Sequence, residues 1–317
     1  MTCPRAYENW QAWQHPIEEN DVSNTELALK HGGIRMRVHD SKVYLNDILP
    51  TTKPNPSFMI YKKYTIKFLC RQQHLLPLSK ADVVLSFGDA CNAISQTYPV
   101  LGENTDIIGN CQSQIPVPLY YWYWNQNGAD DFGEQSSMRV SNMKVPPWES
   151  RKSMIYWKGG LHGSGCRQKI YNLRNTLPFL YIPKEIKSPS NIYNYKYALN
   201  IPGWGVSIRF RNLLLSKYTV PIQCLEKDRR IQTWWHQGLR DGKHYIGVRC
   251  SHIRSDLIQV FEMLQRNQTL ALQIAKNGHE FATECMTDIK THTYFRDSVE
   301  YPRLAYTPKR IGSLIKC

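Results

Sequence analysis

The sequence lacks the features that would assign it to a membrane-spanning, secreted or disordered class. None of its apolar runs approaches the roughly 20 residues that a transmembrane helix needs. Residues 1–18 also lack the apolar stretch of a secretory signal peptide. With 42% hydrophobic and 21% charged residues, the composition is that of a folded protein. We therefore expect a folded cytoplasmic protein without a membrane span; a shortened secretory-pathway chain is the alternative.

The sequence also lacks any CxxC pair, which argues against a zinc knuckle. Its nine cysteines are odd in number and scattered in spacing, which favours a reduced, intracellular setting. Disulfide bonds stay open as the alternative, because spacing alone does not exclude them. The cysteines are Cys3, Cys70, Cys91, Cys111, Cys166, Cys224, Cys250, Cys285 and Cys317.

A third absence concerns charge. The net charge is +14, yet no block of five or more like charges occurs. Nucleic-acid binding usually shows a clustered basic stripe or a recognised module, and neither is evident, so we expect no nucleic-acid partner. The remaining anionic partners include nucleotide-sugars and acidic glycans.

The order of apolar segments predicts an α/β protein of two domains. We expect a β-hairpin over 34–45, a helix over 57–76 and a buried strand over 81–87. Beyond Pro146-Pro147, strands and helices alternate, which predicts a parallel sheet covered on both faces. The expected elements there are strands at 153–157, 195–200, 219–222 and 244–248 and helices at 167–175, 206–216 and 256–280. The predicted domains are 1–145 and 146–285, with 286–317 packing back on the first.

Two glycine-rich loops are the most informative feature of the chain. Residues 153–167 (SMIYWKGGLHGSGCR) and 195–209 (YKYALNIPGWGVSIR) each run from an apolar strand through glycines and a serine to an arginine. Helix N-termini offer unpaired N–H groups and a partial positive charge, and arginine offers a fork of donors that matches phosphate oxygens. Two such elements predict one diphosphate held from two sides.

Several of these segments resemble a known family. WKGGLHGSGCR, KYALNIPGWGVSIRFRNLLLSKYTVPIQ, HYIGV and the SDL…IAKNGHEF segment are similar to the capsule-associated-protein type of glycosyltransferase, glycosyltransferase family 90. That family includes protein O-glucosyltransferases and fungal capsule xylosyltransferases. The resemblance is strong over about 148–285 and traceable back to about 75.

The resemblance implies a GT-B fold, in which two Rossmann-like domains face each other across a cleft. It also implies inverting transfer from a UDP-sugar without a required metal or other cofactor. The family's catalytic aspartate corresponds to Asp89, which ends VLSFGD. A helix N-cap is the alternative for Asp89. No DxD motif is present to hold a divalent ion on the diphosphate.

The family's donor-site arginines correspond to Arg167 and Arg209, and its loop residue to Gly160. The usual arginine before that loop is Lys158 here, and the loop is one residue longer. Alternatives stay open: a surface salt bridge for the arginines, helix caps for Ser164 and Ser207, and a structural role for His244. The full donor set that we expect is Gly159, Gly160, Ser164, Arg167, Asn200, Gly203, Gly205, Ser207, Arg209, His244 and Tyr245.

Three tryptophans are candidates for stacking on an acceptor sugar: Trp122, Trp124 and Trp148. A buried core role is equally open for them, since large aromatic side chains dominate protein cores. The sequence thus predicts an inverting, metal-independent glycosyltransferase that moves a sugar from a UDP-sugar to a glycan hydroxyl. We favour xylose over glucose, because the chain lacks the cysteine framework and KDEL-like signal of secretory-pathway members. A noncatalytic member that only binds its ligands is the alternative.

Overall fold

The computed structural model describes residues 3–4, 32–48, 57–87, 100–103, 105–106, 114–119, 145–183, 189–203, 205, 207, 209–226, 231–300 and 313–314. Contacts divide the chain into two compact units. Unit 1 comprises Met1–Cys3, Glu134–Arg230 and Gly238–Thr287, and unit 2 comprises Pro4–Gly133, Ile231–Gln237 and Asp288–Cys317. The boundaries expected from the sequence, after 145 and after 285, lie near these divisions, and the assignment of independent domains stays a prediction.

Unit 1 is built on a parallel sheet of five strands, in the order β12-β10-β9-β7-β8. Its strands are β7 (Lys152–Tyr156), β8 (Leu180–Tyr181), β9 (Tyr195–Asn200), β10 (Val220–Leu225) and β12 (Ile246–Arg249). Its helices are α5 (Gly165–Leu173), α6 (Arg209–Leu215), α7 (Ile253–Arg266) and α8 (Gln268–Cys285). Short 3-10 turns of unit 1 lie at Trp148–Ser150, Pro189–Asn194 and Cys250–His252, while the turn at His236–Gly238 begins in unit 2.

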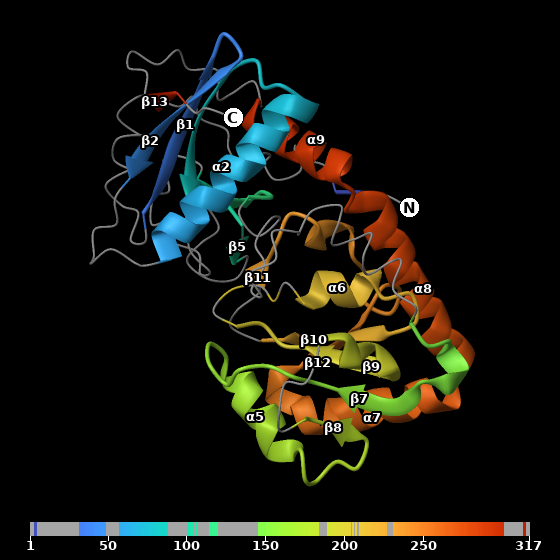
Figure 1. Ribbon diagram of the computed structural model, residues 1–317. Coiled ribbons are helices and arrows are strands. Elements are labelled where there is room, and N and C mark those ends of the chain that lie inside the picture. Colours follow the sequence, from blue (N-terminus) through green and yellow to red (C-terminus); the bar gives the residue numbers. More distant parts are fainter. Residues whose placement is uncertain are drawn as a thin grey trace. The chain divides into compact units, whose positions relative to one another are not determined.

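The sheet of unit 1 is covered on both faces, as the alternating pattern predicts (Figure 1). One face carries α6, whose Leu213 packs with Tyr156 and Ala198. The other face carries α5 and α7, and Ile170 and Leu257 from these helices join a larger core there. Because both faces are buried, the central strands β9 (YKYALN) and β10 (VPIQCL) are buried along almost their whole length.

The long helix expected over 256–280 is two helices, so that prediction is wrong. Asn267, with φ −128° and ψ 76°, ends α7 and begins α8. Its side-chain oxygen accepts a hydrogen bond from the backbone N–H of Leu270 at 2.9 Å. The apolar periodicity continues across Asn267 and so gives no sign of a break. The break arises because the asparagine side chain caps the second helix.

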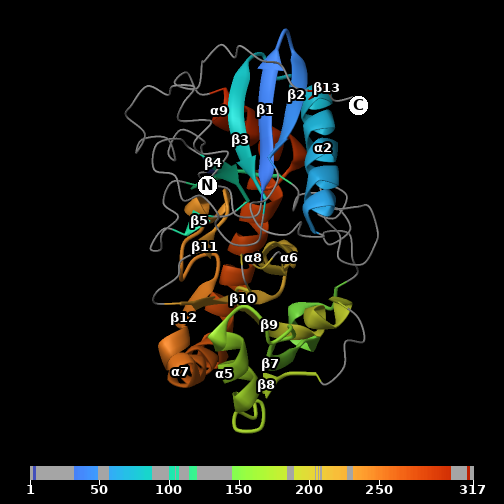
Figure 2. The ribbon, with the colours of Figure 1, turned by 90° about the vertical axis from the view of Figure 1, so that its left-hand side faces the viewer.

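Unit 2 contains a sheet in the order β13-β2-β1-β3-β4-β6, in which β3, β4 and β6 are parallel and the other pairings are antiparallel. Figure 2 shows β1, β2 and β3 side by side, with α2 beside them. The expected hairpin and helix are present as β1, β2 and α2. The elements are β1 (Gly33–His39), β2 (Lys42–Ile48), α2 (Ser57–Leu75), β3 (Ala81–Ser86), β4 (Val100–Gly102), β5 (Thr105–Asp106), β6 (Gln114–Pro116), β11 (Ile231–Gln232), α9 (Asp288–Val299) and β13 (Ser313–Leu314).

The C-terminal segment belongs to unit 2. In α9, Phe295 packs edge-on against Phe68 of α2 at 5.0 Å, and Asp288 forms an ion pair with Arg71. The β13 strand adds to the sheet beside β2. Residues more than 200 positions apart in the sequence therefore share one core.

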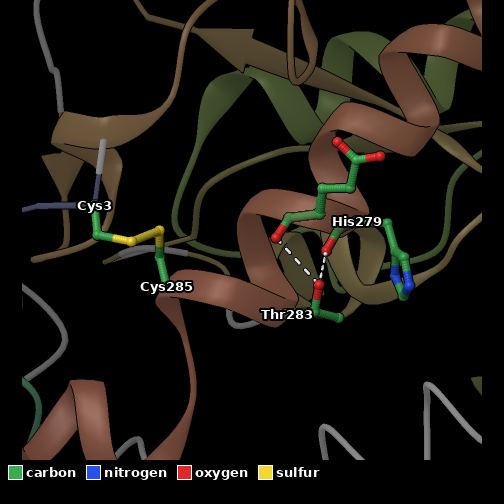
Figure 3. The surroundings of a disulfide bond; sticks show 5 residues. Cys3, His279, Thr283 and Cys285 are labelled. Carbon is green, nitrogen blue, oxygen red and sulfur yellow. Dashed lines mark hydrogen bonds between the residues drawn. A yellow bond between two sulfur atoms is a disulfide. The ribbon is translucent and has the colours of Figure 1, made fainter. Parts of the chain in front are cut away.

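The chain contains disulfide bonds, which overturns the expectation of reduced cysteines. Figure 3 shows the bond between Cys3 and Cys285, at the end of α8. Cys70 is disulfide-bonded as well. Because disulfides persist in oxidising compartments, these bonds remove the reduced-cysteine argument for a cytoplasmic location.

Among the residues that the structure describes, no helix is both long enough and apolar enough to cross a bilayer.

A buried ion pair fixes the first strands of unit 2. Asp82 on β3 accepts two hydrogen bonds of 2.8 Å from the guanidinium of Arg35 on β1, and Arg37 lies 3.5 Å from the same carboxylate. Removing one member of a buried pair leaves an uncompensated charge, at a cost of about 3–5 kcal/mol.

We therefore expect Asp82→Asn to lower the free energy of unfolding by about 3–5 kcal/mol. Urea unfolding followed by circular dichroism measures the change. The matched control is Asp47→Asn, which removes the exposed partner of Lys62 and should change stability by about 1 kcal/mol or less. Equal losses of unfolding free energy in the two variants would show that the buried ion pair stabilises the protein no more than the exposed one does.

Candidate active site

The two glycine loops lie at one edge of the unit 1 sheet. β7 and β9 are parallel neighbours, and Tyr156 is in register with Ala198. The first loop follows β7 and leads into α5, and the second follows β9 and leads into α6. Carboxyl ends of parallel strands meet at the same edge, which is where open α/β sheets place their ligands.

Arg167 connects the two loops. Its guanidinium donates to the carbonyl oxygens of Gly160 (3.1 Å) and His162 (3.2 Å) in the first loop. It also donates to those of Ile201 (3.1 Å) and Pro202 (3.0 Å) in the second. Four of its five N–H groups therefore donate to backbone carbonyl oxygens. We call these four hydrogen bonds, which hold the two loops together, the Arg167 brace.

Gly203 makes this brace possible. A Cβ atom at Gly203 would lie 3.0 Å from Nη2 of Arg167, a separation that real Cβ atoms rarely tolerate. The glycine therefore admits the guanidinium between the loops. Burial lowers the pKa of Arg167, and the charge of Glu226 opposes that shift.

Arg209, the first residue of α6, is the cation without a partner at this edge. Its Nη1 atom is buried and has no hydrogen-bond partner within the described parts of the chain. Burial, and then the charge of Arg167, lower the pKa of Arg209 to about 10. A buried guanidinium beside a second cation favours an anion. Arg209 is thus not the exposed ion pair that the sequence left open.

Gly159 and Trp157 surround the same point. A Cβ atom at Gly159 would lie 3.0 Å from Cζ2 of Trp157 and 3.6 Å from Nη1 of Arg209. The indole Nε1 of Trp157 is also buried, and no described residue accepts its hydrogen bond. Gly159 thus admits the indole ring, and two buried donors whose acceptors are not among the described residues lie near it.

Asn200 adds an acceptor at the end of β9. Its Nδ2 donates to Oε1 of Gln223 at 2.7 Å, while its buried Oδ1 has no partner within the described segments. The site therefore offers two donors for an anion and one acceptor for a hydroxyl or N–H group. This set matches a ligand with both phosphate and hydroxyl chemistry.

The serines and the remaining glycine have local roles in the structure. The Ser164 side chain caps α5 by accepting from the N–H of Cys166 at 3.1 Å, and it also hydrogen-bonds Glu226. The carbonyl of Ser207 accepts from the N–H of Phe210 at 3.0 Å, and that of Gly205 accepts from the N–H of Gly203 at 3.0 Å. Of the two roles left open for Ser164, the cap is the one that the structure shows.

His244 packs against α8. Its ring lies 5.3 Å from that of Phe281, and its Nδ1 accepts from the N–H of Arg240 at 2.9 Å. Burial, helped by Lys243 and Arg240, lowers the pKa of His244 to about 4. The neutral ring therefore carries its proton on Nε2, which is buried without a partner among the described residues.

Tyr245 reaches α6, where its ring meets Phe210 edge-on at 5.6 Å. These contacts connect the His244 turn with α6 and α8 of unit 1. The expected donor role of the His244-Tyr245 pair stays a prediction.

The expected base and two of the acceptor candidates, Asp89, Trp122 and Trp124, lie outside the described residues. Trp148 is described and belongs to the core of unit 1. Its ring meets Tyr197 edge-on at 6.2 Å, and Nζ of Lys196 lies 4.9 Å from its centroid. The contacts of Trp148 are those of a core side chain.

Sequence reasoning missed Trp157 and Glu226. Trp157 ends the strand predicted at 153–157 and lies two residues before Gly159. An indole N–H at the end of a strand was a signal for a hydrogen-bond donor. Glu226 lies four residues beyond the end of the strand predicted at 219–222, where no pattern singles it out. Acidic residues do not gather at this edge: the one metal-competent group among the described residues is Cys166, Cys224 and Cys250.

We expect Gly159→Ala to weaken the binding of inorganic pyrophosphate by tenfold or more, about 1.4 kcal/mol. The added methyl would press on Trp157 and narrow the space beside Arg209. Titration calorimetry measures the change. The control is Gly165→Ala, whose Cβ meets nothing within 4 Å. Equal affinities for the two variants would place the anion elsewhere.

Comparison with known proteins identifies the family of the chain. Residues 1–308 match glycosyl transferase family 90. The chain is 25% identical over 257 residues to "O-glucosyltransferase rumi homolog" of Aedes aegypti, covering 74% of this chain and 59% of that protein. It thus spans about three fifths of that relative's length.

Among solved structures, the crystal structure of TarM is similar over 66% of this chain and 51% of that one, at 9% identity and a TM-score of 0.36. A similarity of that size does not establish a shared fold. The match to the family, in contrast, extends over nearly the whole sequence, and the chain belongs to glycosyl transferase family 90.

Proposed function

We propose that this protein transfers a sugar from a UDP-sugar to a hydroxyl of a glycan acceptor, with inversion at the anomeric carbon and within a GT-B fold. The observation that carries the proposal is the buried Nη1 of Arg209 beside Gly159, which has no hydrogen-bond partner among the described residues. Membership of glycosyl transferase family 90 supports it.

The leaving group is the diphosphate of UDP, on which negative charge grows as the glycosidic bond breaks. Donors held in place before the reaction stabilise such charge without reorganising. We assign this role to Arg209, with the indole N–H of Trp157 as a second donor. Arg167 contributes its positive charge and holds the loops in position through four carbonyl contacts.

We propose that the two arginines take the place of a divalent metal at the diphosphate. The fixed guanidinium of Arg209 neutralises the developing charge, so we propose that no cofactor is needed for transfer. The Oδ1 of Asn200 would accept from a hydroxyl or N–H group of the nucleotide-sugar.

The acceptor hydroxyl must lose its proton as it attacks. We propose Asp89 as the general base, because it follows β3 by three residues on the carboxyl side of that strand. An aspartate has an ordinary pKa of about 3.9 and is ionised at neutral pH. The proton moves from the attacking oxygen to the carboxylate while UDP leaves from the opposite face.

For the donor sugar we propose the gluco configuration that glucose and xylose share. The sequence analysis favours xylose, on the expectation of a cytoplasmic protein with reduced cysteines. The disulfide bonds weaken that reason, and the mosquito relative's name points to glucose. A comparison of turnover with UDP-xylose and UDP-glucose decides between them.

We expect Arg209→Ala to weaken UDP binding by about 1.5–3 kcal/mol, the range for hydrogen bonds to charged groups, or about 10- to 150-fold in Kd. Calorimetric titration of UDP measures the loss. Arg174→Ala is the control, since Arg174 is exposed at the end of α5 and should leave the Kd unchanged. An Arg209→Ala variant that binds UDP like the wild type would remove Arg209 from the site.

We expect Asp89→Asn to abolish transfer to an acceptor while the Kd for UDP changes less than about twofold. The amide no longer accepts the proton but leaves the diphosphate contacts intact. Product formation from both UDP-sugars, measured by mass spectrometry, gives the rate. Transfer at the wild-type rate would reject the base assignment, and absence of turnover in the wild type would favour a noncatalytic member.

A further inference from the structure

Three cysteine side chains from three elements of unit 1 converge on one point. Cys166 is the second residue of α5, Cys224 lies in β10, and Cys250 begins the turn after β12. Their Sγ atoms all lie within 4.8 Å of one another. All three are free of disulfide bonds, Cys166 and Cys224 being buried and Cys250 partly exposed.

The spacing of these sulfur atoms is close to that of metal ligands. Cys166 and Cys224 are 2.8 Å apart, longer than the 2.05 Å or so of a disulfide bond. A Zn–S bond of about 2.3 Å in tetrahedral geometry separates two sulfurs by about 3.8 Å. If the sulfur atoms of Cys166 and Cys224 moved apart by about 1 Å, their separation would match that geometry. The sulfur of Cys250 already lies within 4.8 Å of both.

The third sulfur distinguishes a metal site from a redox pair. A disulfide between Cys166 and Cys224 would use two sulfurs and leave Cys250 without a function. A thiophilic cation uses all three, and each comes from an element that begins or ends at the same edge of the sheet.

We propose that Cys166, Cys224 and Cys250 form a three-thiolate site for Zn²⁺, with the fourth coordination position left to water or another ligand. Thiolates are preferred zinc ligands, and buried soft donors select this class of cation. The site is structural and separate from the reaction, so it does not depend on the proposed function.

Binding of the metal is coupled to proton release. Three thiols lose three protons in forming three bonds to Zn²⁺, which leaves a complex of net charge −1.

A metal at this point would fix the start of α5. Cys166 donates its backbone N–H to Ser164 and directly precedes Arg167, the brace between the loops. Zinc would therefore stabilise unit 1 at the base of the first glycine loop. Removing it should lower the melting temperature without changing the disulfide bonds.

The test is the metal content of the full chain. The protein is purified without chelators from cells grown in zinc-supplemented medium, and its metals are measured by inductively coupled plasma mass spectrometry. We expect one zinc per chain, and replacement by Co²⁺ should give a thiolate-to-cobalt charge-transfer band. Cys224→Ser should lose both. Cys250→His, which keeps a metal ligand, should retain zinc, whereas Cys250→Ser should bind it at least tenfold more weakly. Circular dichroism checks that each variant is folded.

Two results would overturn the proposal. One is a Cys166–Cys224 disulfide in peptide maps of the purified protein, together with a free Cys250. The other is folded wild-type protein with three free thiols that takes up neither zinc nor cobalt at one equivalent.

Discussion

The structure of the candidate site depends on one constraint: a guanidinium is buried with no anion beside it among the residues that the structure describes. Arg209 begins α6 with its Nη1 atom out of contact with solvent and with a second cation, Arg167, close enough to lower its pKa. Desolvation and like-charge repulsion both act against this arrangement. A diphosphate would relieve both at once, because its oxygens accept from the guanidinium and its charge offsets the two cations. The cost of leaving Arg209 in this state is what makes an anionic ligand the natural occupant.

The two arginines divide the work between them. Arg167 donates four hydrogen bonds to carbonyl oxygens of both glycine loops and so holds the two loops in position. In the function that we propose, Nη1 of Arg209 donates to the ligand. Gly203 leaves room for the guanidinium of Arg167, and Gly159 leaves room for the indole of Trp157. Paired strands that end at one edge of a parallel sheet bring these parts together.

Much of the architecture follows from local pattern. The apolar segments at 153–157 and 195–200 and the glycines after them predicted β7, β9 and the two loops, because strand burial and loop chemistry are local properties. Other features depend on contacts distant in sequence. Cys3 and Cys285 are 282 positions apart, and spacing carries no information about such a pair. The carbonyl brace of Arg167 needs both loops in place, and the break at Asn267 hides within a continuous apolar period.

The most direct measurement of the central claim is a comparison of UDP, UMP and uridine as ligands of the wild-type protein by titration calorimetry at one ionic strength. If the buried guanidinium holds the diphosphate, affinity falls steeply from UDP to UMP, and uridine binds weakest. If uridine binds as tightly as UDP, the phosphates contribute nothing and the account of Arg209 is wrong.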